Sequence, residues 1–112
     1  MKFIHTFGTA KRADGKSFIS TDDIVSYKIE IVAKSDKHKD VPVECICYTH
    51  DYCKYVLTPT RPINTKEDIA LLQQFIVELL KVIATTPDGS IIRCYSEDEK
   101  EWNILADIGG GL

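Results

Sequence analysis

Residues 65–84 carry apolar side chains at steps of three and four positions, the spacing of one face of an α-helix. The repeating positions are Ile69, Leu72, Phe75, Ile76, Leu79, Leu80 and Ile83. The stripe is widened beyond one face by Leu71, Val77 and Val82. The clearly polar side consists of Gln74, Glu78, Lys81 and Thr85. A helix this apolar cannot lie half in water, so we expect it in the concavity of a curved sheet or against a second apolar surface.

Both ends of this helix have sequence signals. Asn64 and Thr65 can each cap its N-terminus, because each is followed three positions later by an acidic residue, in capping-box spacing. We expect the helix to run to about Ala84, because Pro87 disfavours helical geometry in the residue before it.

The remaining chain has the pattern of strands. Period-two alternation is clearest over residues 24–34, where one face holds Val25, Tyr27, Ile29, Ile31 and Ala33. The other predicted strands are residues 2–9, 17–20, 41–49, 52–57, 90–96 and 101–108. Residues 21–23 are expected to form a bend, and residues 58–62, with two prolines, a connector. This order of about five strands, a helix and two strands predicts an α+β fold. An antiparallel sheet of about six to seven strands would pack around one long helix.

The chain length of 112 residues fits one domain. We expect a single domain over residues 1–108 and a flexible tail over residues 109–112, where three glycines precede the last leucine. A domain of this size can bury a core without metal or disulfide staples. The hydrophobic share of 44% and charged share of 28% are typical of globular proteins.

The overall charge limits the partners that we expect. A net charge of −3 supplies no surplus of Lys and Arg for duplex DNA or an anionic membrane, so a nucleic-acid partner is not predicted. Residues 11–16 and 34–40 are rich in Lys, but both contain acidic residues and fit solvated hairpin tips. With no membrane-spanning stretch and no apolar segment of a signal peptide, we expect a cytoplasmic protein with reduced cysteines.

The four cysteines, Cys45, Cys47, Cys53 and Cys94, have two interpretations. Together with His50 they suggest a zinc site, but zinc needs ligands that converge on one point. If residues 50–51 form a two-residue turn, Cys53 points to the face opposite Cys45 and Cys47. We therefore expect buried, reduced thiols and predict no metal or other cofactor, although a shift of one residue in the register would move Cys53 across the sheet.

We find no motif that supports catalysis. Cys47 or Cys53 with His50 and Asp51 resembles a nucleophile, a base and an orienting acid, but neighbours in a hairpin point away from one another. The chain also lacks the common nucleophile-elbow, phosphate-loop, dinucleotide and zinc-protease motifs. We therefore assign no catalytic residue.

The hairpin over residues 41–57 is apolar on both faces. One face is predicted to hold Ile46, Tyr48, Tyr55 and Leu57. The other is predicted to hold Val43, Cys45, Cys47 and Val56. One helix can cover only one of these faces, so the other needs the N-terminal hairpin, another subunit or a ligand. We take the face with Ile46 as the candidate interface, because exposed apolar patches mark association sites.

These features favour a non-enzymatic protein-interaction module, such as a small regulator, inhibitor, immunity-type or adaptor protein, that binds a protein partner or forms a homodimer. The alternative is a small-molecule binder or small enzyme with a pocket between sheet and helix. Its candidate pocket residues are Tyr27, His50, Arg93 and Tyr95, with Tyr48 and Tyr55 as further polar groups.

Overall fold

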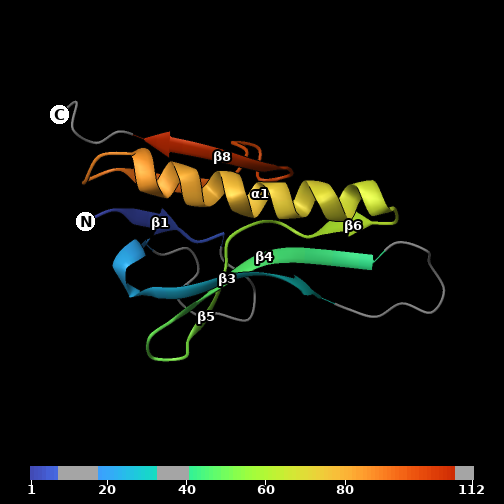
Figure 1. Ribbon diagram of the computed structural model, residues 1–112, viewed down its shortest axis with the longest axis horizontal. Coiled ribbons are helices and arrows are strands. Elements are labelled where there is room, and N and C mark those ends of the chain that lie inside the picture. The colour runs from blue at the N-terminus through green and yellow to red at the C-terminus, as the bar shows by residue number, and fades with distance from the viewer. Residues whose placement is uncertain (8–17, 33–40, 108–112) are drawn as a thin grey trace.

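The computed structural model describes residues 1–7, 18–32 and 41–107 (Figure 1). The strands in these ranges are β1 (Phe3–His5), β2 (Phe18–Ser20), β3 (Ile24–Ile31), β4 (Val41–Thr49), β5 (Lys54–Val56), β6 (Arg61–Ile63), β7 (Ile91–Tyr95) and β8 (Trp102–Asp107). The helices are α1 (Lys66–Thr85) and a short 3₁₀ helix, η1 (Thr21–Asp23), where a bend was expected. The predicted α+β class is confirmed. The extra strand is β6, which forms within and just after the predicted proline-containing connector.

The strands form two sheets. The first has the order β2-β1-β7-β8, and the second has the order β3-β4-β5 with β6 also paired to β4. Most pairs are antiparallel as expected, but β1 and β7 are parallel, with Ile4 opposite Ile92. Parallel neighbours need a long connection, and here the second sheet and α1 lie between them in sequence. Alternation within a strand does not specify such a distant partner or its direction.

The turn between β4 and β5 is longer than predicted. Thr49 and Cys53 close it, because the Thr49 N–H donates to the Cys53 carbonyl at 3.0 Å. Tyr52 within the turn has a φ of 64°, in the left-handed region. Tyr55 consequently lies opposite Cys47, and Ile46 lies opposite Val56. The predicted assignment of Tyr55 to the face of Ile46, and of Val56 to the face of Cys47, is therefore wrong by one residue, because turn length determines hairpin register.

A bulge changes the inner face of β3. Ile24 is opposite Thr49 and Ser26 is opposite Tyr48, so Val25 is the additional residue. Tyr27 and Ile29 pack against the core as expected, and Ile24 joins them. Val25, which was predicted on that inner face, is 56% exposed instead. The predicted Ala33 lies outside the described residues.

The core lies where α1 meets both sheets. Its buried members are Ile4, Ile19, Cys45, Cys47, Leu57, Leu79, Ile92 and Cys94. Figure 1 shows α1 between β8 on one side and β3 and β4 on the other. The sheets are also joined directly, because the Phe7 N–H donates to the Val56 carbonyl at 2.9 Å. The expected concave site for the helix is thus formed by two sheets.

The N-terminus of α1 has the predicted capping box. The Thr65 hydroxyl accepts a hydrogen bond from the Asp68 N–H at 3.2 Å. The Asp68 carboxylate in return accepts from the N–H groups of Asn64 and Thr65, at 3.0 and 3.2 Å. These contacts satisfy backbone donors that the first helical turn would leave without a partner.

The orientation of α1 predicts unequal effects of the same substitution. Leu79 is 0% exposed and Leu71 is 51% exposed. We expect Leu79→Ala to lower the free energy of unfolding by about 2–5 kcal/mol, because it leaves a cavity in the core. Leu71→Ala should lower it by less than about 1 kcal/mol. Urea unfolding followed by circular dichroism measures both, and equal losses would contradict this orientation.

Candidate functional site

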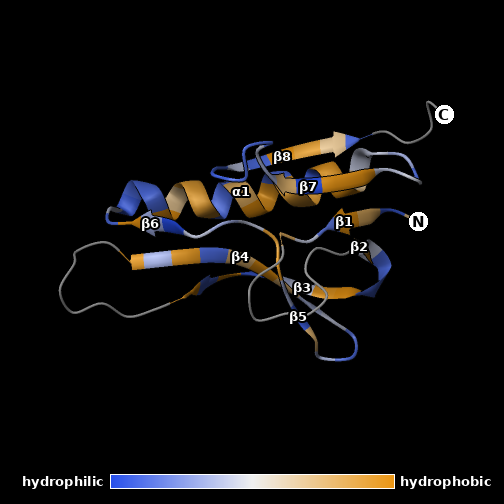
Figure 2. Cartoon of the chain, turned by 180° about the vertical axis from the view of Figure 1, so that it is seen from behind, coloured by the Kyte–Doolittle hydropathy of each residue, from blue (hydrophilic) through white to orange (hydrophobic). Residues whose placement is uncertain are grey.

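One side of α1 carries a row of large apolar side chains that the chain does not cover. Ile69, Val77 and Leu80 are 48%, 49% and 47% exposed, although Leu72 and Leu79 on the neighbouring side are almost fully buried. With the exposed residues Gln73 and Ala84 they occupy an arc of about 80° around the helix axis. We call the set Ile69, Gln73, Val77, Leu80 and Ala84 the helix stripe. Figure 2 shows that hydrophobic residues extend along much of α1.

The five residues of the helix stripe are uncharged, but Lys66 lies in the same arc in the first turn of α1, and charges of opposite sign flank the stripe. Glu67 is in the first turn of α1, and Lys81 is near its C-terminal end. Both lie on the same flank of the stripe, at helical positions about 40° apart. The Lys81 ammonium lies 3.6 Å from the Glu78 carboxylate, and both side chains are at least half exposed. Such a contact is weak in water and leaves Lys81 accessible to another carboxylate.

The apolar surface continues beyond the N-terminal end of the stripe. Val41 of β4 and Ile63 of β6 line a hollow of about 300 Å³ together with Ile69. Ile31 of β3, which pairs with Val43, is 55% exposed. Contiguous exposed apolar surface of this kind marks association sites in soluble proteins.

The structure does not bring the four predicted interface residues together. Ile46 and Leu57 are 0% exposed, so their side chains cannot contact a partner on the surface. Tyr48 and Tyr55 are half-buried, and the register places Tyr55 on the face of Cys47. Four large exposed apolar residues, Ile69, Leu71, Val77 and Leu80, lie on α1 instead.

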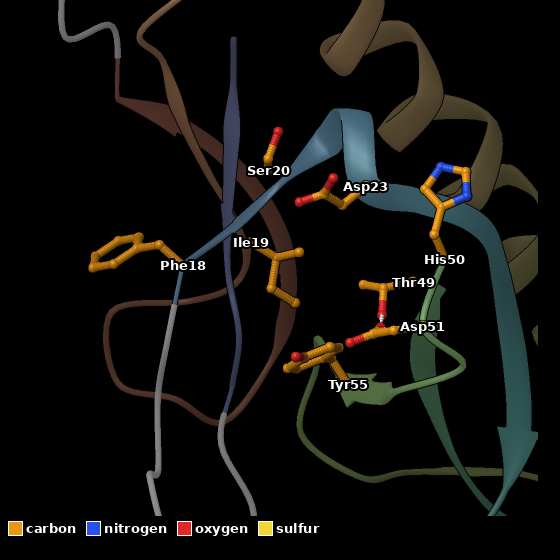
Figure 3. A pocket seen from close by; sticks show the side chains of 8 residues that line it. All are labelled: Phe18, Ile19, Ser20, Asp23, Thr49, His50, Asp51 and Tyr55. Atoms are coloured by element: carbon orange, nitrogen blue, oxygen red, sulfur yellow. Dashed lines mark hydrogen bonds between the residues drawn. The ribbon is translucent and has the colours of Figure 1, made fainter.

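The four predicted pocket residues also lie apart. Only His50 lines a hollow of about 500 Å³, together with Tyr55 and the carboxylates of Asp23 and Asp51 (Figure 3). The hydrogen bond from the Thr49 hydroxyl, and then that from Cys53, holds the pKa of Asp51 below its usual value. The small-molecule hypothesis stays a prediction, and this hollow would be the place to test it.

Arg93 and Tyr95 belong to a different cluster, and Tyr27 is part of the core. The Arg93 guanidinium lies 5.3 Å from the centre of the Tyr95 ring. The Tyr95 hydroxyl is hydrogen-bonded to His5 Nδ1 at 3.0 Å. Tyr27 packs in the second sheet, where burial, and then the neighbouring Cys47, raises its pKa. These groups stabilise the contact between strands and do not converge on the hollow at His50.

The cysteines are free thiols. Cys45, Cys47 and Cys94 are 0% exposed and lie in the core, and Cys53 is half-buried in the turn after β4. Burial, and then the neighbouring Cys47, raises the pKa of Cys45 to about 12. Burial also raises the pKa of Cys94 well above its ordinary value. Within residues 1–7, 18–32 and 41–107, no group of three or more His, Cys, Asp or Glu residues is arranged to hold a metal ion.

This burial predicts which thiol reacts first. A thiolate is the reactive form, so Cys45, Cys47 and Cys94 should resist alkylation in the folded protein and Cys53 should react alone. Iodoacetamide labelling followed by peptide mass spectrometry measures this. The Cys53→Ser variant should show almost no labelling until urea is added. Rapid labelling of Cys45 or Cys94 in the native protein would contradict the burial seen here.

No helix in the described part of the chain is both long enough and apolar enough to cross a membrane. Comparisons with protein-family models, with curated proteins and with solved structures found no significant match to this chain.

The sequence contained a signal for the exposed residues of the helix stripe. The apolar repeat predicts the helix, and Val77 widens the repeat beyond one face. Its exposure was not predicted, because the covered arc of a helix depends on where two sheets meet it. The wide repeat was the available signal, since two sheets against one side of a helix still leave another side in water.

Proposed function

We propose that this protein is a non-enzymatic protein-interaction module that self-associates through the helix stripe. The observation that carries the proposal is the row of three large side chains, Ile69, Val77 and Leu80, each about half exposed and uncharged. Covering the exposed part of each one is worth about 1 kcal/mol by area burial. An association that covers all three therefore has a clear driving force.

The occupant of the helix stripe is a second copy of the chain in antiparallel orientation. A twofold axis near the middle of α1, between Gln73 and Val77, places Ile69 against the partner's Leu80. The same axis places Glu67 beside the partner's Lys81. A parallel arrangement in register would keep Glu67 and Lys81 about 21 Å apart along the helices, so neither would meet a charge of opposite sign. Antiparallel helices also place opposite ends of their dipoles together.

The available area indicates a weak, reversible dimer. A helix of this length spans about 30 Å, and a contact strip about 10 Å wide covers about 300 Å² per partner. Stable interfaces bury about 800 Å² per partner. The hollow lined by Val41, Ile63 and Lys66 adjoins the stripe at Ile69 and adds area at its N-terminal end. We therefore expect a dissociation constant in the micromolar range or weaker, on the order of 10⁻⁵ M.

Sedimentation equilibrium from micromolar to millimolar concentration tests this proposal. The wild-type protein should shift from monomer to dimer, and Leu80→Glu should weaken the dimer at least about tenfold, because it buries an unpaired charge. Leu71→Glu makes the same substitution at a 51% exposed position on the opposite side of α1 and should leave association unchanged. A wild-type protein that stays monomeric at every concentration would overturn the proposal.

Charge exchange tests the antiparallel orientation. Glu67→Lys and Lys81→Glu should each weaken the dimer, because each places like charges together across the twofold axis. The double variant restores opposite charges and should recover most of the wild-type affinity. Additive loss in the double variant would rule out this pairing.

A further inference from the structure

A second apolar surface lies on the other side of α1. The helix and β8 enclose a groove of about 460 Å³ that is separate from the helix stripe. Phe75 and Val82 of α1 and Trp102 and Ile104 of β8 line its apolar part. Leu71, also in the lining, leaves 51% of its side chain exposed. The groove can therefore accept an apolar side chain from outside.

Trp102, at the floor of this groove, is fixed by two contacts. The Trp102 indole N–H donates to the Pro59 carbonyl at 2.7 Å. Its ring lies 5.1 Å from the Phe75 ring, centre to centre, at an interplanar angle of 58°. These two contacts fix the indole orientation, so binding over it requires little rearrangement.

One end of the groove holds two cationic side chains, Arg61 and Lys100, with acidic groups close to each. A neighbouring hollow of about 390 Å³ shares Arg61 and Trp102 with the groove and adds Lys100 and the opposing Glu101. The Arg61 guanidinium is 3.7 Å from the Asp68 carboxylate, which leaves most of its N–H donors for another acceptor. Lys100 forms no ion pair with the described residues. This end therefore suits a carboxylate.

The lining also includes a carboxylate, that of Glu78, contributed by α1 one turn beyond Phe75. The groove therefore has cationic groups at the start of β8 and an acidic group farther along α1. An extended ligand with a carboxylate at one end and a basic group upstream would match this charge distribution.

The edge of the first sheet adds a means of backbone recognition. β8 is the last strand in the order β2-β1-β7-β8, so its outer edge faces no other described strand. An exposed edge can accept a peptide as an additional strand, with specificity from pockets for its side chains. A peptide whose C-terminus lies at Trp102 would run antiparallel to β8, the more stable pairing direction.

We propose that the groove between α1 and β8 binds the C-terminal segment of a partner protein as an added antiparallel strand. Its last, apolar side chain lies over Phe75 and Trp102, and its terminal carboxylate contacts Arg61 and Lys100. A Lys or Arg a few residues upstream lies near Glu78. This surface goes beyond the proposed dimer, because it uses the opposite flank of α1.

Trp102 is the only tryptophan of the chain, so its fluorescence reports directly on the groove. The probe is an acetylated hexapeptide without aromatic residues, with Lys at its second position, Leu at its end and a free carboxylate. Titration should change the Trp102 emission saturably. The C-terminal amide of the same peptide should bind at least about tenfold more weakly, because it loses the charge-assisted contacts. Equal binding of acid and amide, or no saturable change at millimolar peptide, would overturn the proposal.

Variants test the contacts. Arg61→Gln and Lys100→Gln should each weaken the free-acid peptide by about threefold to tenfold and leave the amide unchanged. Lys100→Gln does not touch the helix cap, so it remains informative if Arg61→Gln fails to fold. Lys28→Gln removes the same charge from an exposed position of β3, outside the groove lining, and should leave binding unchanged. Octanoate tests a simple amphiphilic carboxylate, and binding as tight as that of the peptide would overturn strand addition.

Peptide binding can be measured independently of dimer formation. Leu80→Glu should bind the peptide like the wild type, because Leu80 lies outside the groove lining. Peptide binding by a protein that is monomeric would support the groove and contradict the dimer. Dimer formation without peptide binding would overturn the groove alone.

Discussion

The packing of one side of α1 between two sheets is the interaction on which the rest of the structure depends. Leu72 and Leu79 are the almost fully buried residues of the helix, and Leu79 belongs to the cluster that joins both sheets. The sheets also pack directly on each other, because Cys94 of the first sheet lies in one cluster with Cys45 and Cys47 of the second. The helix closes this shared core with Leu79 and with the partly buried Phe75, Ile76, Val82 and Ile83.

This arrangement leaves two flanks of the helix for other uses. The flank with Ile69 and Leu80 is mainly apolar, with Lys66 at its N-terminal end, and continues onto β4 and β6, which suits a broad contact with another helix. The flank with Leu71 meets an edge strand and forms a narrow groove with charged groups, which suits an extended segment. Two separate exposed apolar surfaces thus lie on one element.

Residues close in sequence were enough to predict some elements but not others. The capping box of Thr65 and the bounds of β4 follow from residues close in sequence. The register of β5 does not, because it depends on a turn in which the Thr49 hydroxyl bonds Asp51 and Tyr52 takes a positive φ. The exposure of Val77 depends on which arc the sheets cover, so its role as a surface residue required the tertiary structure.

We propose that the helix stripe pairs with itself in antiparallel orientation. The most direct measurement is an isotope-filtered NOE spectrum of a mixture of ¹³C-labelled and unlabelled protein at millimolar concentration. Antiparallel pairing predicts intermolecular cross-peaks between the methyl groups of Ile69 and the partner's Leu80. Cross-peaks from Ile69 to the partner's Ile69 in place of these, or no intermolecular cross-peaks from α1, would contradict it.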